Sequence, residues 1–194
     1  MSCYLRLCVV TIVAWQLGLG TRALADAGCP QGTFSVINSP DGSSLTILFD
    51  SFSISAAGGA GKRADEKACK LSVPLHLEEG YSLGVYRVDY RGFAHLSVKQ
   101  HAELAVNYAL GPKQKSRQYH RRINGDYDGE FLFTENIGAG LMRRVGCGEE
   151  ALLNVAVTLS LQTKGAGDAL VALDSTDGAP KGGLIYYFDI KPCH

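Results

Sequence analysis

The sequence lacks the short motifs that identify several classes of enzyme. Its five histidines form no H-x-H or H-E-x-x-H ligand pair, and it contains no G-x-S-x-G nucleophile turn. The stretch Gly58–Arg63 lacks the glycine spacing and the final Ser or Thr of a phosphate-binding loop. These absences argue against a zinc protease of that motif, an α/β-hydrolase and a P-loop nucleotide-binding protein.

The sequence also lacks net charge and, after its first 25 residues, any long apolar run. It has 19 Lys and Arg residues against 19 Asp and Glu residues. This balance predicts no general attraction to nucleic acid or to an anionic membrane. No later segment approaches the roughly 20 apolar residues that a membrane-spanning helix needs, so we expect no transmembrane segment.

The first 25 residues have the three parts of a secretory signal peptide. Arg6 supplies the positive charge, Leu7–Gly20 is the apolar region, and Ala23-Leu24-Ala25 supplies the small residues of a cleavage site. We expect cleavage after Ala25, with Ala27 as the alternative. Residues 26–194 would then form a single exported domain, either extracellular or periplasmic in a Gram-negative bacterium.

The predicted cleavage would leave four of the six cysteines, namely Cys29, Cys69, Cys147 and Cys193. An even number in an exported chain indicates two disulfides, and the wide spacing argues against a zinc site. Four cysteines allow three pairings, which the residues alone do not resolve. We favour Cys29–Cys193 with Cys69–Cys147, because the first bond would tie the two ends of the mature chain together.

Apolar and polar residues alternate through most of the mature chain, as they do in half-buried strands. Turn signals such as Asn124-Gly125 and Asp177-Gly178 separate these stretches, and we expect one short helix near Arg63–Lys67. The pattern predicts an all-β fold, an antiparallel β-sandwich of the Greek-key or jelly-roll kind with about eight to ten strands. Strands are predicted at 44–55, 70–77, 82–96, 104–110, 129–137, 152–162, 169–173 and 184–190.

One acidic loop matches the ligand spacing of a calcium site. Asn124, Asp126 and Asp128 stand at alternate positions before Gly129, and Glu135 follows at the twelfth position. The flanking residues resemble strands and not the helices of an EF-hand, so a polar hairpin turn is the alternative. No other cofactor is expected.

Polar residues elsewhere suggest three further sites. Asp89 and Arg91 share one face of a predicted strand beside Arg87, where they form either a buried or semi-buried Asp–Arg pair or a polar site on the sheet face. Tyr86 and Tyr90 have the opposite parity and would not join them. Asp50 is a carboxylate in an apolar strand, and it could pair with Arg91 or act as a catalytic acid. The loop with Asp174 and Asp177 is either a metal or sugar site or a hydrogen-bonded turn.

A basic run between residues 113 and 122 could bind an anionic polysaccharide, envelope lipid or nucleic acid. The alternative is a solvated loop. Its cations are Lys113, Lys115, Arg117, Arg121 and Arg122.

Several stretches together resemble a known family. They include Ser39-Pro40-Asp41-Gly42, Val88-Asp89-Tyr90-Arg91-Gly92-Phe93, Cys147-Gly148, Asp174-Ser175-Thr176-Asp177-Gly178 and a cysteine near the C-terminus. They resemble the secreted-protein family catalogued as domain of unknown function 4360, over essentially the whole mature chain. The resemblance implies a secreted, β-rich domain with four cysteines, and it implies no activity. The basic run is a departure, because relatives are expected to carry Ser, Thr and Gln there.

These features leave three hypotheses for function. The first is a non-enzymatic secreted protein that binds a glycan, a cell surface or a protein partner. The second is an extracellular hydrolase with carboxylates such as Asp50, Asp89 or Asp174, which would need two facing carboxylates. The third is a structural or effector protein.

Overall fold

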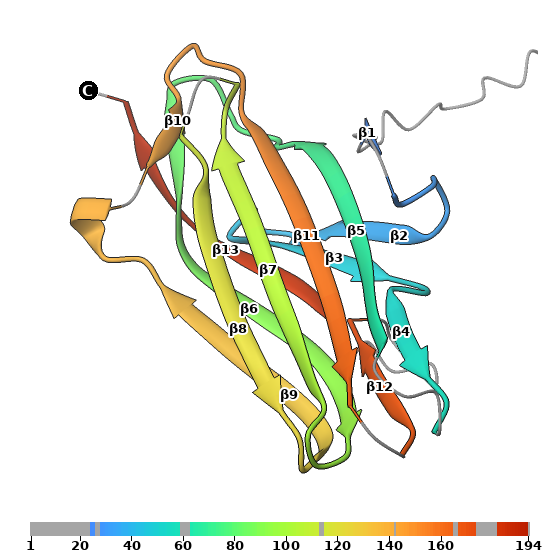
Figure 1. The fold of residues 1–194 in the computed structure, drawn as a ribbon. Helices are drawn as coiled ribbons and strands as arrows, with labels where there is room; N and C mark the ends of the chain where they lie inside the picture. The colour runs from blue at the N-terminus through green and yellow to red at the C-terminus, as the bar shows by residue number, and fades with distance from the viewer. Residues whose placement is uncertain are drawn as a thin grey trace, which may run out of the picture.

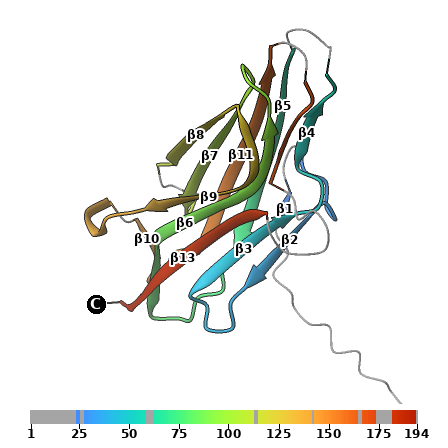
Figure 2. The same cartoon turned by 90° about the horizontal axis from the view of Figure 1, so that it is seen from below.

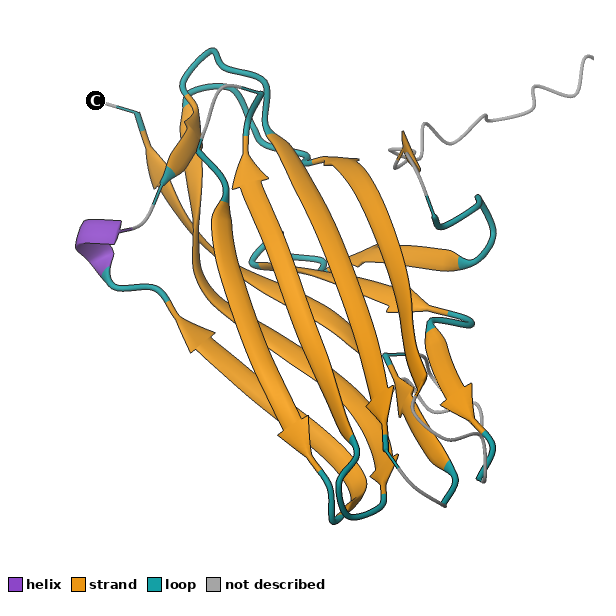
Figure 3. Cartoon of the chain, in the orientation of Figure 1, coloured by secondary structure: helices purple, strands orange, loops and turns teal. Residues whose placement is uncertain are grey.

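The computed structural model describes most of the chain that follows the predicted signal peptide. The described residues are 24–25, 28–58, 63–112, 115–141, 143–164, 167–173 and 182–193. Most of the predicted signal segment, together with Lys113, Asp174 and Asp177, lies outside them. Within the described residues, almost every element is a strand, and the single helical element is the 3₁₀ turn η1 (Ala139–Leu141) (Figure 3).

Two antiparallel sheets pack face to face (Figures 1 and 2). The first sheet contains β1 (Leu24–Ala25), β5 (Arg63–Pro74), β11 (Leu152–Thr163), β7 (His101–Leu110) and β8 (Arg117–Asn124), in that spatial order. The main path of the second sheet contains β2 (Phe34–Asn38), β3 (Ser44–Phe49), β13 (Gly183–Pro192), β6 (Tyr81–Leu96), β12 (Ala169–Ala172) and β4 (Ser53–Ala56). The strands β9 (Tyr127–Asn136) and β10 (Arg144–Gly146) pair with the opposite edge of β6. The predicted all-β antiparallel sandwich is confirmed.

Alternate residues along the strands of both sheets point inward and together form one hydrophobic core. Every second residue of β11 is buried, from Leu153 to Leu161, and β7 follows the same pattern. The facing layer contributes Leu45, Ile47 and Tyr186, which are fully buried. One face of each sheet therefore lies in the core, and the other face is left to carry polar side chains.

β6 is the central strand of the second sheet, and Gly92 marks the place where its neighbour changes. β6 pairs with β13 up to Arg91 and with β12 from Phe93 onward. A Cβ atom at Gly92 would lie 2.3 Å from the carbonyl oxygen of Ala172 and 2.4 Å from the ring of Phe131. Only glycine fits beneath the ring of Phe131. Because Gly92 has no Cβ, β12 and Phe131 can approach β6 closely here, and β6 continues unbroken where its neighbour changes.

The disulfide pairing predicted from the sequence is wrong. The structure joins Cys29 to Cys69 and Cys147 to Cys193. The segment before β2 runs against β5, where a Cβ atom on Gly28 would collide with the carbonyl oxygen of Ala68. Each bond therefore ties a terminal segment to the strand or turn that lies beside it, and neither bond joins the two ends of the chain.

Three local predictions also differ from the structure. Arg63–Lys67 is the start of β5 and not a helix, because it pairs with the last residues of β11. The predicted strand Ser44–Ser55 is divided into β3 and β4 by a bend at Asp50 and Ser51. From Arg117 onward the basic run is the edge strand β8 and not a loop. The described residues form thirteen strands, which is more than the predicted eight to ten. The difference arises because several strands of two to five residues carry little sequence signal.

Among the described residues, no helix combines the length and the apolar character that crossing a membrane would require.

Candidate functional site

The outer face of the second sheet carries an unusual set of side chains along β6. The pairing of β6 with β13 shifts between Tyr187 and Phe188, so that Val85 and Arg87 are paired and Tyr86 is left as the extra residue. Such a bulge reorients the side chains beside it. Tyr86 consequently reaches solvent with 42% of its surface exposed, on the same face as Arg87 and Asp89. The prediction that Tyr86 would not join these residues is wrong. Tyr90 lies on the opposite face, as predicted, and the structure buries it in the core.

Asp89 is fully buried although its strand position faces outward. Its Oδ1 accepts hydrogen bonds from Arg87 Nε at 2.9 Å and from Thr134 Oγ1 at 2.8 Å. Its Oδ2 accepts from Arg87 Nη2 at 2.7 Å and from Tyr187 Oη at 3.3 Å. The neighbouring side chains on the sheet, and not the core, cover this carboxylate and hold it in one orientation.

Two opposing effects act on the Asp89 carboxyl. Burial raises its pKa, but the hydrogen bonds from Arg87, Thr134 and Tyr187 outweigh burial and hold the pKa below its usual value. The same ion pair raises the pKa of Arg87. Asp89 and Arg87 are therefore a charged pair with fixed geometry at neutral pH.

The tyrosine rings lie directly beside this pair. The guanidinium of Arg87 lies 4.9 Å from the ring centre of Tyr187, and the ring centres of Tyr86 and Tyr187 are 6.2 Å apart. Arg91, two positions beyond Asp89, has a buried Nε with no hydrogen-bond partner among the described residues. We call Tyr86, Arg87, Asp89, Arg91 and Tyr187 the tyrosine platform.

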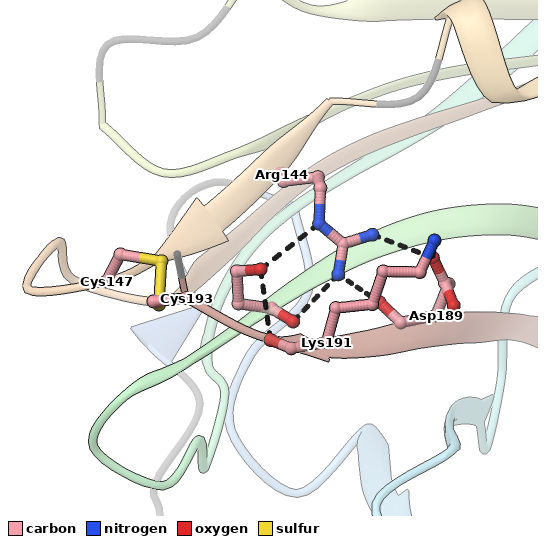
Figure 4. Close-up of a disulfide and its surroundings, with 6 residues drawn as sticks. Arg144, Cys147, Asp189, Lys191 and Cys193 are labelled. Atoms are coloured by element: carbon pink, nitrogen blue, oxygen red, sulfur yellow. Dashed lines mark hydrogen bonds and ion pairs between the residues drawn. A yellow bond between two sulfur atoms is a disulfide. The ribbon is translucent and has the colours of Figure 1, made fainter.

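A second charged cluster extends the same face toward β10 (Figure 4). Gly84 of β6 pairs with Arg144 on one side and with Asp189 on the other. Since Gly84 has no side chain, the guanidinium of Arg144 crosses β6 and donates from Nη1 to Asp189 Oδ2 at 2.8 Å. It also donates to Ser82 Oγ and to the carbonyl oxygens of Ser82 and Asp189. Lys191 lies 3.2 Å from Asp189, and the Cys147–Cys193 disulfide closes this end (Figure 4).

Asp89, Arg91 and Arg87 can be predicted from the sequence as one polar group, but their partners on other strands cannot. Tyr187 and Asp189 have the outward parity of β13, which the alternation in that strand could have shown. Thr134 and Arg144 carry no signal of their own, because only the pairing of β9 and β10 with β6 brings them here.

The structure does not bring the proposed catalytic carboxylates together. Asp50 is exposed in the bend after β3, four residues beyond Thr46. Asp89 pairs with Ile185 of β13, which in turn pairs with Thr46 of β3, so Asp89 and Thr46 are two strand spacings apart. At ~3.3 Å per residue and ~4.8 Å between strands, the Cα atoms of Asp50 and Asp89 are roughly 16 Å apart. Glycoside hydrolysis needs a pair separated by about 5–10 Å. Asp174 and Asp177 lie outside the described residues.

The four residues of the predicted calcium loop do not form one ligand shell. Asn124 and Asp128 flank the β8–β9 turn, where Asn124 accepts from Arg122 and Asp128 contacts His95 at 3.1 Å. Asp126 lies within the turn. Glu135 lies seven residues beyond Asp128 along β9, which places the two Cα atoms about 23 Å apart in an extended strand. Among the described residues, no three His, Cys, Asp or Glu side chains gather as a metal site. Calcium binding by this loop stays a prediction.

Glu135 takes part in an ion pair between the two sheets. It accepts hydrogen bonds from Arg117 Nε at 2.6 Å, from Tyr90 Oη at 2.8 Å and from Tyr108 Oη at 3.2 Å. Burial, reinforced by this carboxylate, raises the pKa of both tyrosines. Glu135 therefore joins strands of both sheets where β8 and β9 diverge (Figure 1).

The basic run is divided between different surroundings. Arg117 pairs with Glu135, and Arg121 lies over the ring of Tyr119 at 5.3 Å. Arg122 lies on the opposite face of β8, where it approaches Glu103 at 3.6 Å. Lys115 lines a small pocket between the sheets. The four cations of the run that the structure describes therefore do not form one continuous patch, and anion binding by this run stays a prediction.

The chain is similar to a protein-family model, to a secreted protein and to a solved structure. The family model described as "Domain of unknown function (DUF4360)" matches residues 24–193. An "Uncharacterized secreted protein" from Arthroderma benhamiae is 24% identical over 128 residues, which are 66% of this chain and 52% of that protein. The chain thus spans about half the length of that relative. A solved structure titled as TmCBM61 in complex with beta-1,4-galactotriose is similar with a TM-score of 0.30 at 12% identity, covering 88% of this chain and 87% of the other.

The family match spans both disulfides, every described strand and both charged clusters on the outer face of the second sheet. Together with the motifs around Asp89 and Cys147, it agrees with the resemblance predicted from the sequence. The chain belongs to the domain of unknown function 4360 family.

Proposed function

We propose that this protein is secreted and binds a glycan on the tyrosine platform without acting as an enzyme. The observation that carries the proposal is the fixed Arg87–Asp89 pair beside two partly exposed tyrosine rings, Tyr86 and Tyr187. The carboxylate of Asp89 is buried on the face of the sheet that points away from the core, so its burial does not come from core packing. A binding surface gains from such a carboxylate, because polar groups that are already oriented lose little entropy when a ligand arrives.

The chemistry of a sugar ring complements this surface. A pyranose has an apolar face of C–H groups, which packs against an aromatic ring, and a rim of hydroxyls that both donate and accept. Tyrosine offers a large apolar surface with a polar tip. The guanidinium of Arg87 and the side chain of Arg91 supply donors to hydroxyl oxygens. Asn136 and Thr134 of β9 lie opposite Arg87 and Asp89 and could take further hydroxyls.

Export is supported by independent observations. The first 25 residues have the composition of a signal peptide, and the four remaining cysteines form two disulfides. The similar protein from Arthroderma benhamiae is named as secreted. N-terminal sequencing of the exported protein should give a first residue of Asp26, or Gly28 for the alternative site. Recovery of Met1 in the exported protein would contradict this part of the proposal.

A glycan array with the purified exported protein tests the binding directly, followed by depletion from solution on the matching insoluble polysaccharide. Tyr86→Ala and Tyr187→Ala should each weaken binding by about tenfold, since a lost aromatic contact costs about 1.4 kcal/mol. Tyr81→Ala is the matched control, because Tyr81 is similarly exposed but lies away from the platform. If the wild-type protein retains no glycan, the proposal fails and the structural or effector hypothesis is favoured.

A further inference from the structure

A groove of about 440 Å³ lies on the inner side of the second sheet, at one end of the sandwich. Its two walls are the β2–β3 turn and the connection between β5 and β6, and Leu83, Phe188 and Ile190 contribute its apolar surface. Phe188 and Ile190 alternate with Tyr187 and Asp189 along β13. The groove and the tyrosine platform are therefore on opposite faces of the same sheet.

The groove carries acidic groups and no Lys or Arg among the described residues that line it. Asp41 comes from one wall, His76 and Glu78 come from the other, and neither carboxylate has a cationic partner in the described part of the chain. Hydrogen bonds from Ser39 and Ser43 lower the pKa of Asp41 to about 2. Asp41 is therefore ionised at any ordinary extracellular pH.

Tyr81 adds an aromatic ring to this acidic groove, with 38% of its surface exposed. Its backbone is held in place, because Tyr81 O accepts a hydrogen bond from Cys147 N at 3.0 Å. Cys193 N donates to Gly80 O at 2.7 Å, and a disulfide links Cys193 to Cys147. The disulfide thus holds the backbone that carries Tyr81 beside the groove that this residue lines.

The opposite wall is fixed as well. Asp41 Oδ1 accepts hydrogen bonds from Ser43 N at 3.1 Å and Ser43 Oγ at 2.8 Å, and Gly42 N donates to Ser39 O at 3.0 Å. These bonds position the carboxylate of Asp41 before any ligand binds, which reduces the entropy lost on binding.

We propose that this groove binds an organic cation, an ammonium group carried on an apolar body. The ring of Tyr81 offers its negative face to the cation. Asp41 and Glu78 supply opposite charge, and Leu83, Phe188 and Ile190 contact the apolar part of the ligand. A neutral molecule of the same shape would keep the apolar contacts but lose the cation–π contact with Tyr81 and the ionic contacts with Asp41 and Glu78.

Choline and its neutral isostere 3,3-dimethylbutan-1-ol test this inference on the exported protein, with binding followed by the amide chemical shifts of an isotope-labelled sample. Choline should saturate and shift the signals of Asp41, His76, Glu78 and Tyr81. The isostere should bind at least about fivefold more weakly, since it lacks the cation–π and ionic contacts. Equal binding of the two probes, or no saturable shift with choline, would overturn the inference.

Variants locate the site. Tyr81→Leu should weaken choline binding by about fivefold, whereas Tyr81→Phe should retain it because the ring remains. Asp41→Asn and Glu78→Gln should each weaken binding about two- to fivefold, as expected for partly exposed ion pairs. Glu149→Gln is the matched control outside the groove and should bind choline like the wild type. Tyr86→Ala should also leave choline binding unchanged, so the result is independent of glycan binding.

Discussion

Asp89 is the residue on which the proposed site depends, because its carboxylate orients Arg87, Thr134 and Tyr187 at once. Asp89→Asn removes the charge and replaces an acceptor oxygen with a donor. We expect the free energy of unfolding at pH 7 to fall by about 1–3 kcal/mol. Urea denaturation measures this change, with Asp50→Asn as a control because Asp50 is exposed in a bend.

The pH dependence of the same variant gives a second expected outcome. The folded-state pKa of Asp89 lies below its usual value, so the carboxylate contributes stability above about pH 4. That contribution is lost as the pH falls through the folded-state pKa and the carboxylate takes up a proton. The stability difference between wild type and Asp89→Asn should therefore shrink below about pH 4. A difference that stays constant from pH 7 to pH 3 would show that Asp89 is not held as a charged group.

At the scale of elements, the two disulfides close loops of nearly equal length, with sequence separations of 40 and 46 residues. Loop entropy alone predicts that each bond stabilises the fold by about 4 kcal/mol. The bonds differ in place, since Cys147–Cys193 clamps β10 and the end of β13, whereas Cys29–Cys69 clamps the segment before β2 to β5. Paired Cys→Ala variants should thus lose similar stability.

Hydrogen exchange separates the two variants. Removal of Cys147–Cys193 should speed exchange in β10 and at the start of β6, around Tyr81, and leave β7 and β11 protected. Removal of Cys29–Cys69 should act on the segment before β2. If both variants exchange faster in the same elements, the disulfides do not act locally as described.

At this scale the sequence predicted most of the long strands, because their alternation is set by the core they share. It could not predict the β-bulge at Tyr86, since register depends on which strand becomes the neighbour. It could not predict that Arg63–Lys67 is extended, because only pairing with β11 makes it so. The disulfide pairs were missed for the same reason, as each depends on which segments the fold places side by side.

For the whole molecule, the sandwich leaves three separate surfaces with different chemistry. The outer face of the second sheet has aromatic rings and charged pairs, and the end groove is acidic and apolar. The outer face of the first sheet has mostly small and polar side chains, such as Ala156, Thr158 and Ser160 of β11. Composition alone shows a chain without net charge, and only the fold reveals how the charges are distributed over these surfaces.

Amide chemical-shift mapping of the labelled protein, with the glycan that the array selects, shows directly whether the glycan binds at the tyrosine platform. We expect the largest shifts on Tyr86, Arg87, Arg91 and Tyr187, with smaller shifts on the β9 residues opposite them. The first sheet and the groove around Tyr81 should be unaffected. Shifts centred on the outer face of the first sheet or on the groove, with the tyrosine platform unchanged, would show that the glycan binds elsewhere and that the proposed site is wrong.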